Sequence, residues 1–335
     1  MTSFVSHLEG AIDGARLPAW TLQTVHEGRP IWVRYDLAAV RAAVKRDDMA
    51  GREPTMWRYR ELLPIEREEN TVSLGETMTP LIECGRLAKH FGMKRLIIKD
   101  ESRLPTGSFK SRGMAMAVSL AKALGVKRVA APTAGNAGGA LAAYAARAGL
   151  ECFIFMPQDT PIVNQCEAAL FGARCFLVNG LISDCGRIVG EGKDFMQWFD
   201  MSTLREPYRI EGKKTMGLEL AEQMNWNLPD VILYPTGGGT GLIGMWKAFH
   251  ELAALGWLES EKRPRMFACQ CDGCAPFVNE AYPINVTLHG AFGDGTWIVG
   301  TAIGPGPWPA PGGPECMWMR VANLSGDSSA LKATD

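Results

Sequence analysis

The chain is 335 residues long, with 47% hydrophobic and 21% charged residues and a formal net charge of −1. This length allows a large core and favours two domains, and the composition is that of a soluble globular protein. The near-neutral charge gives no indication of a nucleic-acid partner, and no apolar run approaches the ~20 residues of a membrane span. Residues 1–10 contain no signal-peptide core, so the nine cysteines suggest reduced thiols and a cytoplasmic location.

The first 70 residues predict a helical lead-in. Residues 37–44 have helical character, and residues 56–63 form a second, shorter helical candidate. Four charged residues at 66–69 indicate a connection just before Asn70. No pattern in this segment points to chemistry, and its charges are interpreted as a solvated surface.

From Gly92 onward, apolar runs alternate with helical patterns. Strands are predicted at 96–99, 128–131, 152–156, 175–178, 231–234 and 266–271. Helices are predicted at 115–124, 136–148, 165–171, 182–195, 214–224 and 242–255. This alternation favours an α/β fold with parallel sheets flanked by helices. Ligands in such folds bind beyond the carboxyl ends of strands, so three glycine-bearing loops that follow strands are expected to face one crevice.

The first loop, residues 104–113, brings Lys110 into the first turn of a predicted helix, with Ser108 as a candidate N-cap. A cation there opposes the helix dipole, which costs roughly 0.3–1 kcal/mol. The same field lowers the lysine pKa and favours the neutral amine, the form that a Schiff-base nucleophile requires. A solvated lysine near a helix start explains this stretch equally well.

The second loop, residues 132–139, joins a predicted strand to an alanine-rich helix. Small residues let backbone N–H groups approach a ligand, and a helix N-terminus favours an anion such as a carboxylate. Asn136 can donate to or accept from a ring substituent. Taken alone, this loop favours a structural interpretation, in which Gly138 and Gly139 allow close helix packing and Asn136 caps the helix.

The third loop, residues 235–242, has four glycines within five positions before a predicted helix. Such a run predicts a nest of N–H groups for a phosphate, to which the hydroxyls of Thr236 and Thr240 can add. A packing role alone is a weak explanation, because each glycine costs conformational entropy.

The third loop also permits a second class of function. Residues 239–244 match the dinucleotide fingerprint, and Glu259 lies about 20 residues further on. However, fewer than about 100 residues follow, too few for a second mononucleotide half, and Glu259 lies in a polar stretch instead of at a strand end. An NAD-binding dehydrogenase is therefore the second-ranked class.

Taken in order, Thr-Gly-Ser-Phe-Lys, Ala-Gly-Asn and Gly-Gly-Gly-Thr-Gly resemble the motifs of fold-type II pyridoxal-phosphate enzymes. Residues 74–81, 99–102 and 211–215 further resemble threonine synthase, over about residues 55–280. The resemblance implies a two-domain α/β fold. The expected boundaries are 71–125 and 195–280 for a large cofactor-binding domain and 126–194 for a small domain.

The resemblance also implies roles for individual residues. Lys110 would attach pyridoxal 5'-phosphate as a Schiff base and later move protons, with Phe109 beside the cofactor ring and Asn136 on its 3-hydroxyl. Arg209 matches an arginine that binds the substrate phosphate in some threonine synthases, although a salt bridge explains it equally well. The cofactor phosphate would be held by Gly237, Gly238, Gly239, Thr240 and Gly241. The substrate carboxylate would be bound by Thr133, Ala134 and Gly135.

The implied reaction converts O-phosphohomoserine, a small amino-acid substrate, and water into threonine and phosphate, in a homodimer. Two departures favour related activities: Ala137 stands where many threonine synthases have a hydroxyl residue, and residues 202–205 differ from the usual phosphate-binding sequence. A serine/threonine ammonia-lyase or a β-replacement enzyme would use the same cofactor site. A non-catalytic protein with the same fold is the remaining class.

The last segment, residues 281–335, is an atypical Pro/Gly-rich tail in which the resemblance stops. Such a composition predicts poor order and a truncated or altered end, and therefore weak or absent catalysis. Ser325 is a faint candidate for the hydroxyl that the family offers to the pyridine nitrogen. Just before the tail, Cys269, Cys271 and Cys274 have close spacing but no fourth ligand nearby, so no metal site is expected.

Overall fold

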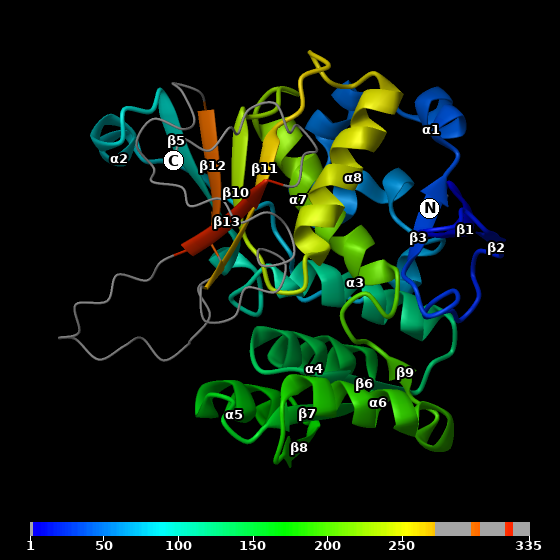
Figure 1. Ribbon diagram of the computed structural model, residues 1–335. Helices are drawn as coiled ribbons and strands as arrows, with labels where there is room; N and C mark the ends of the chain where they lie inside the picture. Colours follow the sequence, from blue (N-terminus) through cyan, green and yellow to red (C-terminus); the bar gives the residue numbers. More distant parts are fainter. Residues whose placement is uncertain (1–2, 272–295, 302–318, 324–335) are drawn as a thin grey trace.

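The computed structural model describes residues 3–271, 296–301 and 319–323. A central helix, α3 (Lys110–Ala123), lies between a large sheet and a smaller one (Figure 1). The large sheet comprises β4 (Leu81–Glu83), β5 (Arg95–Asp100), β10 (Val231–Pro235), β11 (Arg265–Cys271), β12 (Thr296–Thr301) and β13 (Met319–Asn323). The small sheet comprises β6 (Arg128–Pro132), β7 (Glu151–Pro157), β8 (Arg174–Val178) and β9 (Phe199–Asp200).

The strand pairings confirm the expected α/β fold. The large sheet has the order β13-β11-β10-β12-β5-β4, with parallel pairing except at its two edge strands, β13 and β4. The small sheet has the order β8-β7-β6-β9, and all of its pairings are parallel. Six consecutive residues of β7 are buried, as expected for a parallel strand covered on both faces.

Helices cover both sheets. Helices α7 (Tyr208–Gln223) and α8 (Thr240–Leu255) contact each other, and α8 contributes to the same apolar core as β10 and β11. Helices α4 (Asn136–Ala148), α5 (Ile162–Leu170) and α6 (Ile182–Met196) surround the small sheet. A short helix, α2 (Gly85–His90), contacts β5. No helix among these described elements is long and apolar enough to cross a membrane.

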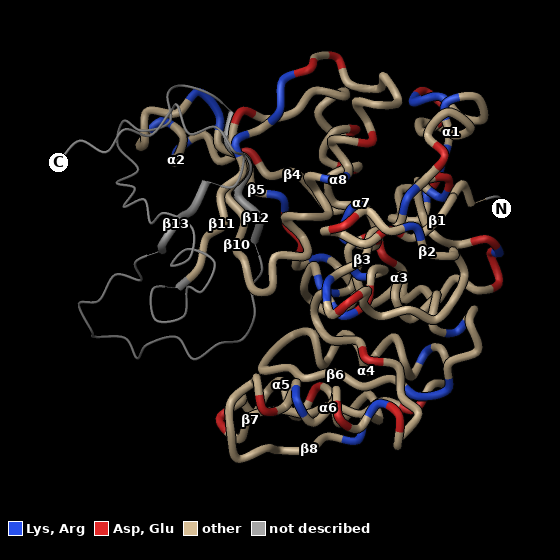
Figure 2. The backbone as a smooth tube through the Cα atoms, turned by 45° about the vertical axis from the view of Figure 1, so that its right-hand side comes forward, with Lys and Arg blue, Asp and Glu red and all other residues tan. Residues whose placement is uncertain are grey.

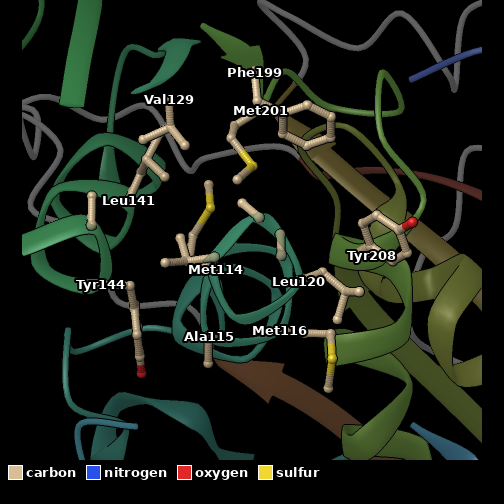
Figure 3. Close-up of a cluster of buried hydrophobic side chains, with 14 of the residues drawn as sticks. Met114, Ala115, Met116, Leu120, Val129, Leu141, Tyr144, Phe199, Met201 and Tyr208 are labelled. Carbon is tan, nitrogen blue, oxygen red and sulfur yellow. The ribbon is translucent and has the colours of Figure 1, made fainter. Parts of the chain in front are cut away.

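Helix α3 connects the two halves because it is buried on every side. Eleven consecutive residues, from Ser111 to Ala121, are buried. Its contacts extend to both α7 and α4. Figure 3 shows Met114 of α3 grouped with Val129 of β6 and Leu141 of α4. A helix that is buried all round is rigidly held, so the residues at its first turn have a fixed position.

The expectation of a helical lead-in over residues 1–70 is wrong for its first half. Strands β1 (Val5–Gly10), β2 (Arg16–Leu17) and β3 (Ile31–Tyr35) form a separate antiparallel sheet with the order β2-β1-β3. The strands are short and one contains His and Glu, so their period-two pattern is weak in the sequence. Helix α1 (Leu37–Ala43) and three 3-10 helices (Arg46–Gly51, Met56–Leu62 and Glu68–Asn70) follow.

Two further expectations need correction. The boundary at residue 194 is too early, because α6 continues to Met196 and β9 then joins the small sheet. The tail also supplies two strands, β12 in parallel between β10 and β5, and β13 beside β11. Thr296–Thr301 contains an aromatic and two β-branched apolar residues in a row, which favours a strand. The segment was not predicted as a strand because Gly/Pro-rich stretches flank it on both sides. The rest of the tail, including Ser325, lies outside the described residues.

Candidate active site

The loops after β5 and β10 meet α7 around one small cavity. The carboxyl ends of these two strands lie at the same edge of the large sheet, where ligands of α/β proteins bind. The structure thus brings together two of the three expected loops. The lining residues are Phe109, Lys110, Thr203, Arg209, Lys213, Tyr234, Gly237, Gly238, Gly239, Thr240 and Gly241.

Lys110 is the first residue of α3. The helix is capped at Phe109, one residue after the expected Ser108, whose hydroxyl accepts the Lys110 N–H at 3.4 Å. The amine lies 3.6 Å from the centre of the Phe109 ring. Burial lowers the pKa of Lys110 to about 7, and the Arg209 charge adds to this. The lowered pKa expected from the sequence is therefore present, but burial, not the helix dipole, is its main cause.

Three glycines of the third loop, the glycine loop, occupy positions where a larger residue would be strained or would clash with its neighbours. Gly239 has a φ of +76°, and a Cβ at Gly238 or Gly241 would lie only 2.2 Å from Thr203 Cγ2 or 1.9 Å from the Tyr234 hydroxyl. Because these glycines have no side chain, the backbone of the loop lines the cavity where α8 begins. Helix α8 has 16 residues and no side-chain N-cap. Its first N–H groups are therefore available to an anion.

Two buried cations on α7 complete the cavity. Arg209 was expected from the sequence, and Lys213 was missed, although its spacing of four residues places it on the same helix face. Arg209 Nη1 donates to the Met201 carbonyl at 2.7 Å, and Arg209 Nε has no hydrogen-bond partner among the described residues. Within the same part of the chain, Arg209 forms no ion pair with a carboxylate, so the salt-bridge interpretation finds no support.

Asp200 and Glu206 are two buried carboxylates that act on the charge of Arg209, and Glu206 has the larger effect. Glu206 accepts the backbone N–H groups of Tyr208 at 2.6 Å and Arg209 at 3.0 Å. Burial raises the pKa of Glu206 to about 7, against the opposing effect of Arg209. Among the described residues, the cavity lining thus contains three basic side chains, Lys110, Arg209 and Lys213, and no carboxylate.

The second loop lies at the end of β6 and does not line this cavity. The Thr133 hydroxyl donates to the Gly135 carbonyl at 2.9 Å, and the Asn136 side-chain oxygen accepts from Asn164 Nδ2 at 3.2 Å. Asn136 begins α4, and its N-cap is Gly135. The roles expected for Thr133, Ala134, Gly135 and Asn136 stay predictions.

The packing interpretation of this second loop is confirmed for its two later glycines. A Cβ at Gly138 would meet Thr133 Cγ2 at 2.6 Å, and one at Gly139 would meet the Glu167 carboxylate at 2.2 Å. Both positions are therefore closely packed. At Gly138 the neighbour is the short Thr133 side chain, whereas the flexible Glu167 side chain could move away from a Cβ at Gly139.

Two other buried charge clusters lie near the cavity. In the first, Arg112 and Lys99 bind Glu101 and Glu219, with Arg112 Nη1 to Glu219 Oε1 at 2.6 Å. The second, formed by Lys214 and Lys247 with Glu211 and Glu251, has four N···O distances of 2.7–2.9 Å. In each of these clusters the cations and carboxylates are equal in number.

Comparison with known proteins identifies the family to which this chain belongs. Residues 72–311 match a family model described as pyridoxal-phosphate dependent enzyme. The chain belongs to this family, and its cofactor is pyridoxal phosphate. The resemblance seen in the sequence is confirmed, and the dehydrogenase interpretation of the third loop is set aside.

Among the relatives are two proteins named threonine synthase. One, from Methanocaldococcus jannaschii, is 34% identical over 258 residues, which cover 77% of this chain and 63% of that protein. The other, from Methanosarcina acetivorans, is 34% identical over 247 residues, which cover 73% of this chain and 59% of that protein. The chain thus spans about three fifths of the length of these relatives.

Solved structures show the same fold. A pyridoxal 5'-phosphate-dependent aspartate racemase has a TM-score of 0.52 at 22% identity, over 62% of this chain and 64% of that chain. Serine racemase from Dictyostelium discoideum has a TM-score of 0.50 at 25% identity, over 61% and 63% of the two chains. The fold is therefore that of fold-type II enzymes, as expected.

The residues of the cavity fit the cofactor. A phosphate needs N–H donors and positive charge, and the loop at the start of α8 lies beside buried Arg209 and Lys213. A Schiff base needs a neutral lysine amine, which Lys110 supplies. The excess of basic side chains beside the glycine loop is a feature that the phosphate group of the cofactor would satisfy.

Proposed function

We propose that this chain is a lyase of the threonine synthase type, which converts O-phosphohomoserine and water into threonine and phosphate. The observation that carries the proposal is Arg209, which is 3% exposed, lines the cavity beside Lys110 and has an unpartnered Nε. A buried guanidinium with an open donor matches a phosphate ester better than a hydroxyl group. The relatives named threonine synthase support the same substrate class.

Different residues of this chain would carry out different parts of the reaction. When bound, pyridoxal phosphate supplies an electron sink for charge that develops on the amino acid. The Lys110 amine would accept the proton from the substrate Cα, because its pKa near 7 suits a base at neutral pH. After a second proton leaves Cβ, the Cγ–O bond breaks and Arg209 would hold the departing phosphate. Water then adds its hydroxyl at Cβ, and protons return to Cα and Cγ.

The test is a product assay on the cofactor-loaded protein. With O-phosphohomoserine we expect threonine and inorganic phosphate in equal amounts. Arg209→Gln should lower kcat/KM for this substrate by about 100-fold, since a charge-assisted bidentate contact is lost. Cofactor absorbance should stay near its wild-type value in this variant. Absence of threonine formation by the wild type, or no effect of the substitution, would overturn the proposal.

An ammonia-lyase acting on serine or threonine is the second candidate. It is favoured by Ala137, which offers no hydroxyl to a substrate phosphate at the second residue of α4. An ammonia-lyase would release ammonia and a 2-oxo acid from serine or threonine and would leave O-phosphohomoserine unchanged. The same assay therefore separates the two activities.

Two other expectations stay predictions. The homodimer follows from the resemblance alone, and light scattering on the purified protein would test it. The cytoplasmic location is likewise a prediction, which fractionation of expressing cells would test.

A further inference from the structure

Two neighbouring lysines of α7 are both buried but have opposite surroundings. Lys214 lies 2.7 Å from Glu211 and 2.9 Å from Glu251. Lys213 is 2% exposed and forms no ion pair with a carboxylate among the described residues. A buried ammonium without a carboxylate is costly unless another anion reaches it.

The position of Lys213 is fixed by the packing of α7 on α3. A Cβ at Gly212 would lie 2.0 Å from the Arg112 carbonyl, so the two helices approach closely there. A Cβ at Gly113 would lie 3.1 Å from Lys213 Cε, so Gly113 leaves room for the lysine stem. The side chain is therefore directed along the helix interface instead of being free to leave it.

The ammonium group of Lys213 ends beside the glycine loop. Lys213 Nζ donates to Thr240 Oγ1 at 2.5 Å, and Thr240 is the first residue of α8. The same Nζ lies 5.0 Å from the centre of the Phe109 ring, next to Lys110 in the chain. Lys213 thus stands between the phosphate-binding helix start and the lysine that carries the cofactor.

We propose that Lys213 binds the cofactor phosphate directly, together with Thr240 and the glycine loop. Burial, followed by the charges of Lys110 and Arg209, lowers the pKa of Lys213 well below its usual value. A phosphate anion reverses this balance and holds the amine in its charged form. The assignment rests on family membership and is independent of the amino-acid substrate.

The test compares pyridoxal phosphate with pyridoxal, which forms the same bond to Lys110 but has no phosphate. In Lys213→Gln the amide can still donate to Thr240, but the charge is gone. We expect the affinity for pyridoxal phosphate to fall about 10- to 100-fold and the affinity for pyridoxal to change less than about twofold. The matched control is Lys122→Gln, which removes a charge from an exposed position of α3 and should change neither affinity.

A second readout separates this role from a structural one. Removal of an unpaired buried charge should raise the unfolding midpoint of the cofactor-free protein, whereas removal of a structural lysine should lower it. A lowered midpoint, a chain that fails to fold, or equal losses of affinity for both cofactor forms would overturn the proposal. Neither measurement uses an amino-acid substrate, so failure of the proposed reaction would leave this result unaffected.

Discussion

Buried charges in this molecule occur in two kinds of environment, within a few turns of the same helix. On one side of α7, Lys214 shares a cluster with as many carboxylates as cations, and Glu219 belongs to a second balanced cluster. In contrast, the basic side chains of Lys110, Arg209 and Lys213 line one cavity with no carboxylate in its described lining, and Glu206 and Asp200 act on Arg209 from outside that lining. Figure 2 shows acidic and basic segments close together where α3, α7 and β3 meet. In the balanced clusters the cations and carboxylates compensate one another and support the fold, whereas the basic side chains of the cavity, which we call the unbalanced cluster, would be compensated by an anion from outside the chain.

The largest effect should come from Lys110. Lys110→Ala removes the amine that forms the covalent bond to the cofactor, so we expect turnover to fall by more than about 10³-fold with the fold retained. Reduction of the wild type with borohydride, followed by mass spectrometry, should place the cofactor mass on the peptide with Lys110. Label on a different lysine would refute the assignment.

The next largest effect should come from the glycine loop. Gly239→Asp places a carboxylate in the loop that we expect to bind the cofactor phosphate, so the purified variant should retain no cofactor. Gly239→Asn is the matched control, because asparagine has a similar size and tolerates a φ of +76°, but carries no charge. Equal loss of cofactor in both variants would show that the glycine is needed for shape and not for charge.

A substitution in a balanced cluster should lower the stability of the fold instead of weakening cofactor binding. Glu219 is fully buried and binds Arg112 and Lys99. Glu219→Gln leaves the two cations with Glu101 as the remaining carboxylate of the cluster, so we expect a loss of about 3–5 kcal/mol in the free energy of unfolding. Glu151→Gln, which breaks a solvent-exposed pair with Arg128, should cost less than about 1 kcal/mol. Urea denaturation measures both, and equal effects would remove the distinction between the two environments.

The smallest effect is a pH dependence of stability in the cofactor-free protein. The pKa of Lys110 is about 7 in the folded chain and near 10.5 when unfolded, so the unfolded state binds more protons between these values. Stability should therefore rise with pH from about 7 to 10, and this contribution should be fully lost once the pH has fallen to about 7. Lys110→Ala should flatten the slope of the unfolding midpoint against pH. An identical slope in both proteins would contradict the lowered pKa.

The sequence predicted the parts of the fold with strong local signals. Six of the seven strands from residue 92 to 271 and the helices between them formed where apolar runs and 3.6-residue patterns predicted them, although α7 begins at Tyr208, before the expected residue 214. Strand β9 was missed because two residues carry no period, and β1 and β3 because their alternation of apolar and polar residues is weak in the sequence.

The residues of the candidate site also differ in whether the sequence predicts them. Lys110 and the glycine loop lie at junctions between a strand and a helix. Ligands of α/β proteins bind at such junctions, so the sequence pattern alone pointed to these residues. Lys213 lies inside a helix, where a lysine is ordinarily a solvent-facing residue, and only the helix packing against Gly113 shows that it is buried. The absence of a carboxylate beside it, within the described part of the chain, is a property of the tertiary structure that no local pattern encodes.

Competition by inorganic phosphate tests the central claim, that the unbalanced cluster is a phosphate site. Cofactor-free wild type would be titrated with pyridoxal phosphate and, separately, with pyridoxal, each at increasing phosphate concentration. We predict that phosphate raises the apparent Kd for pyridoxal phosphate in proportion to its concentration and does not weaken pyridoxal binding. A phosphate effect that is absent, or that weakens both equally, would contradict the account.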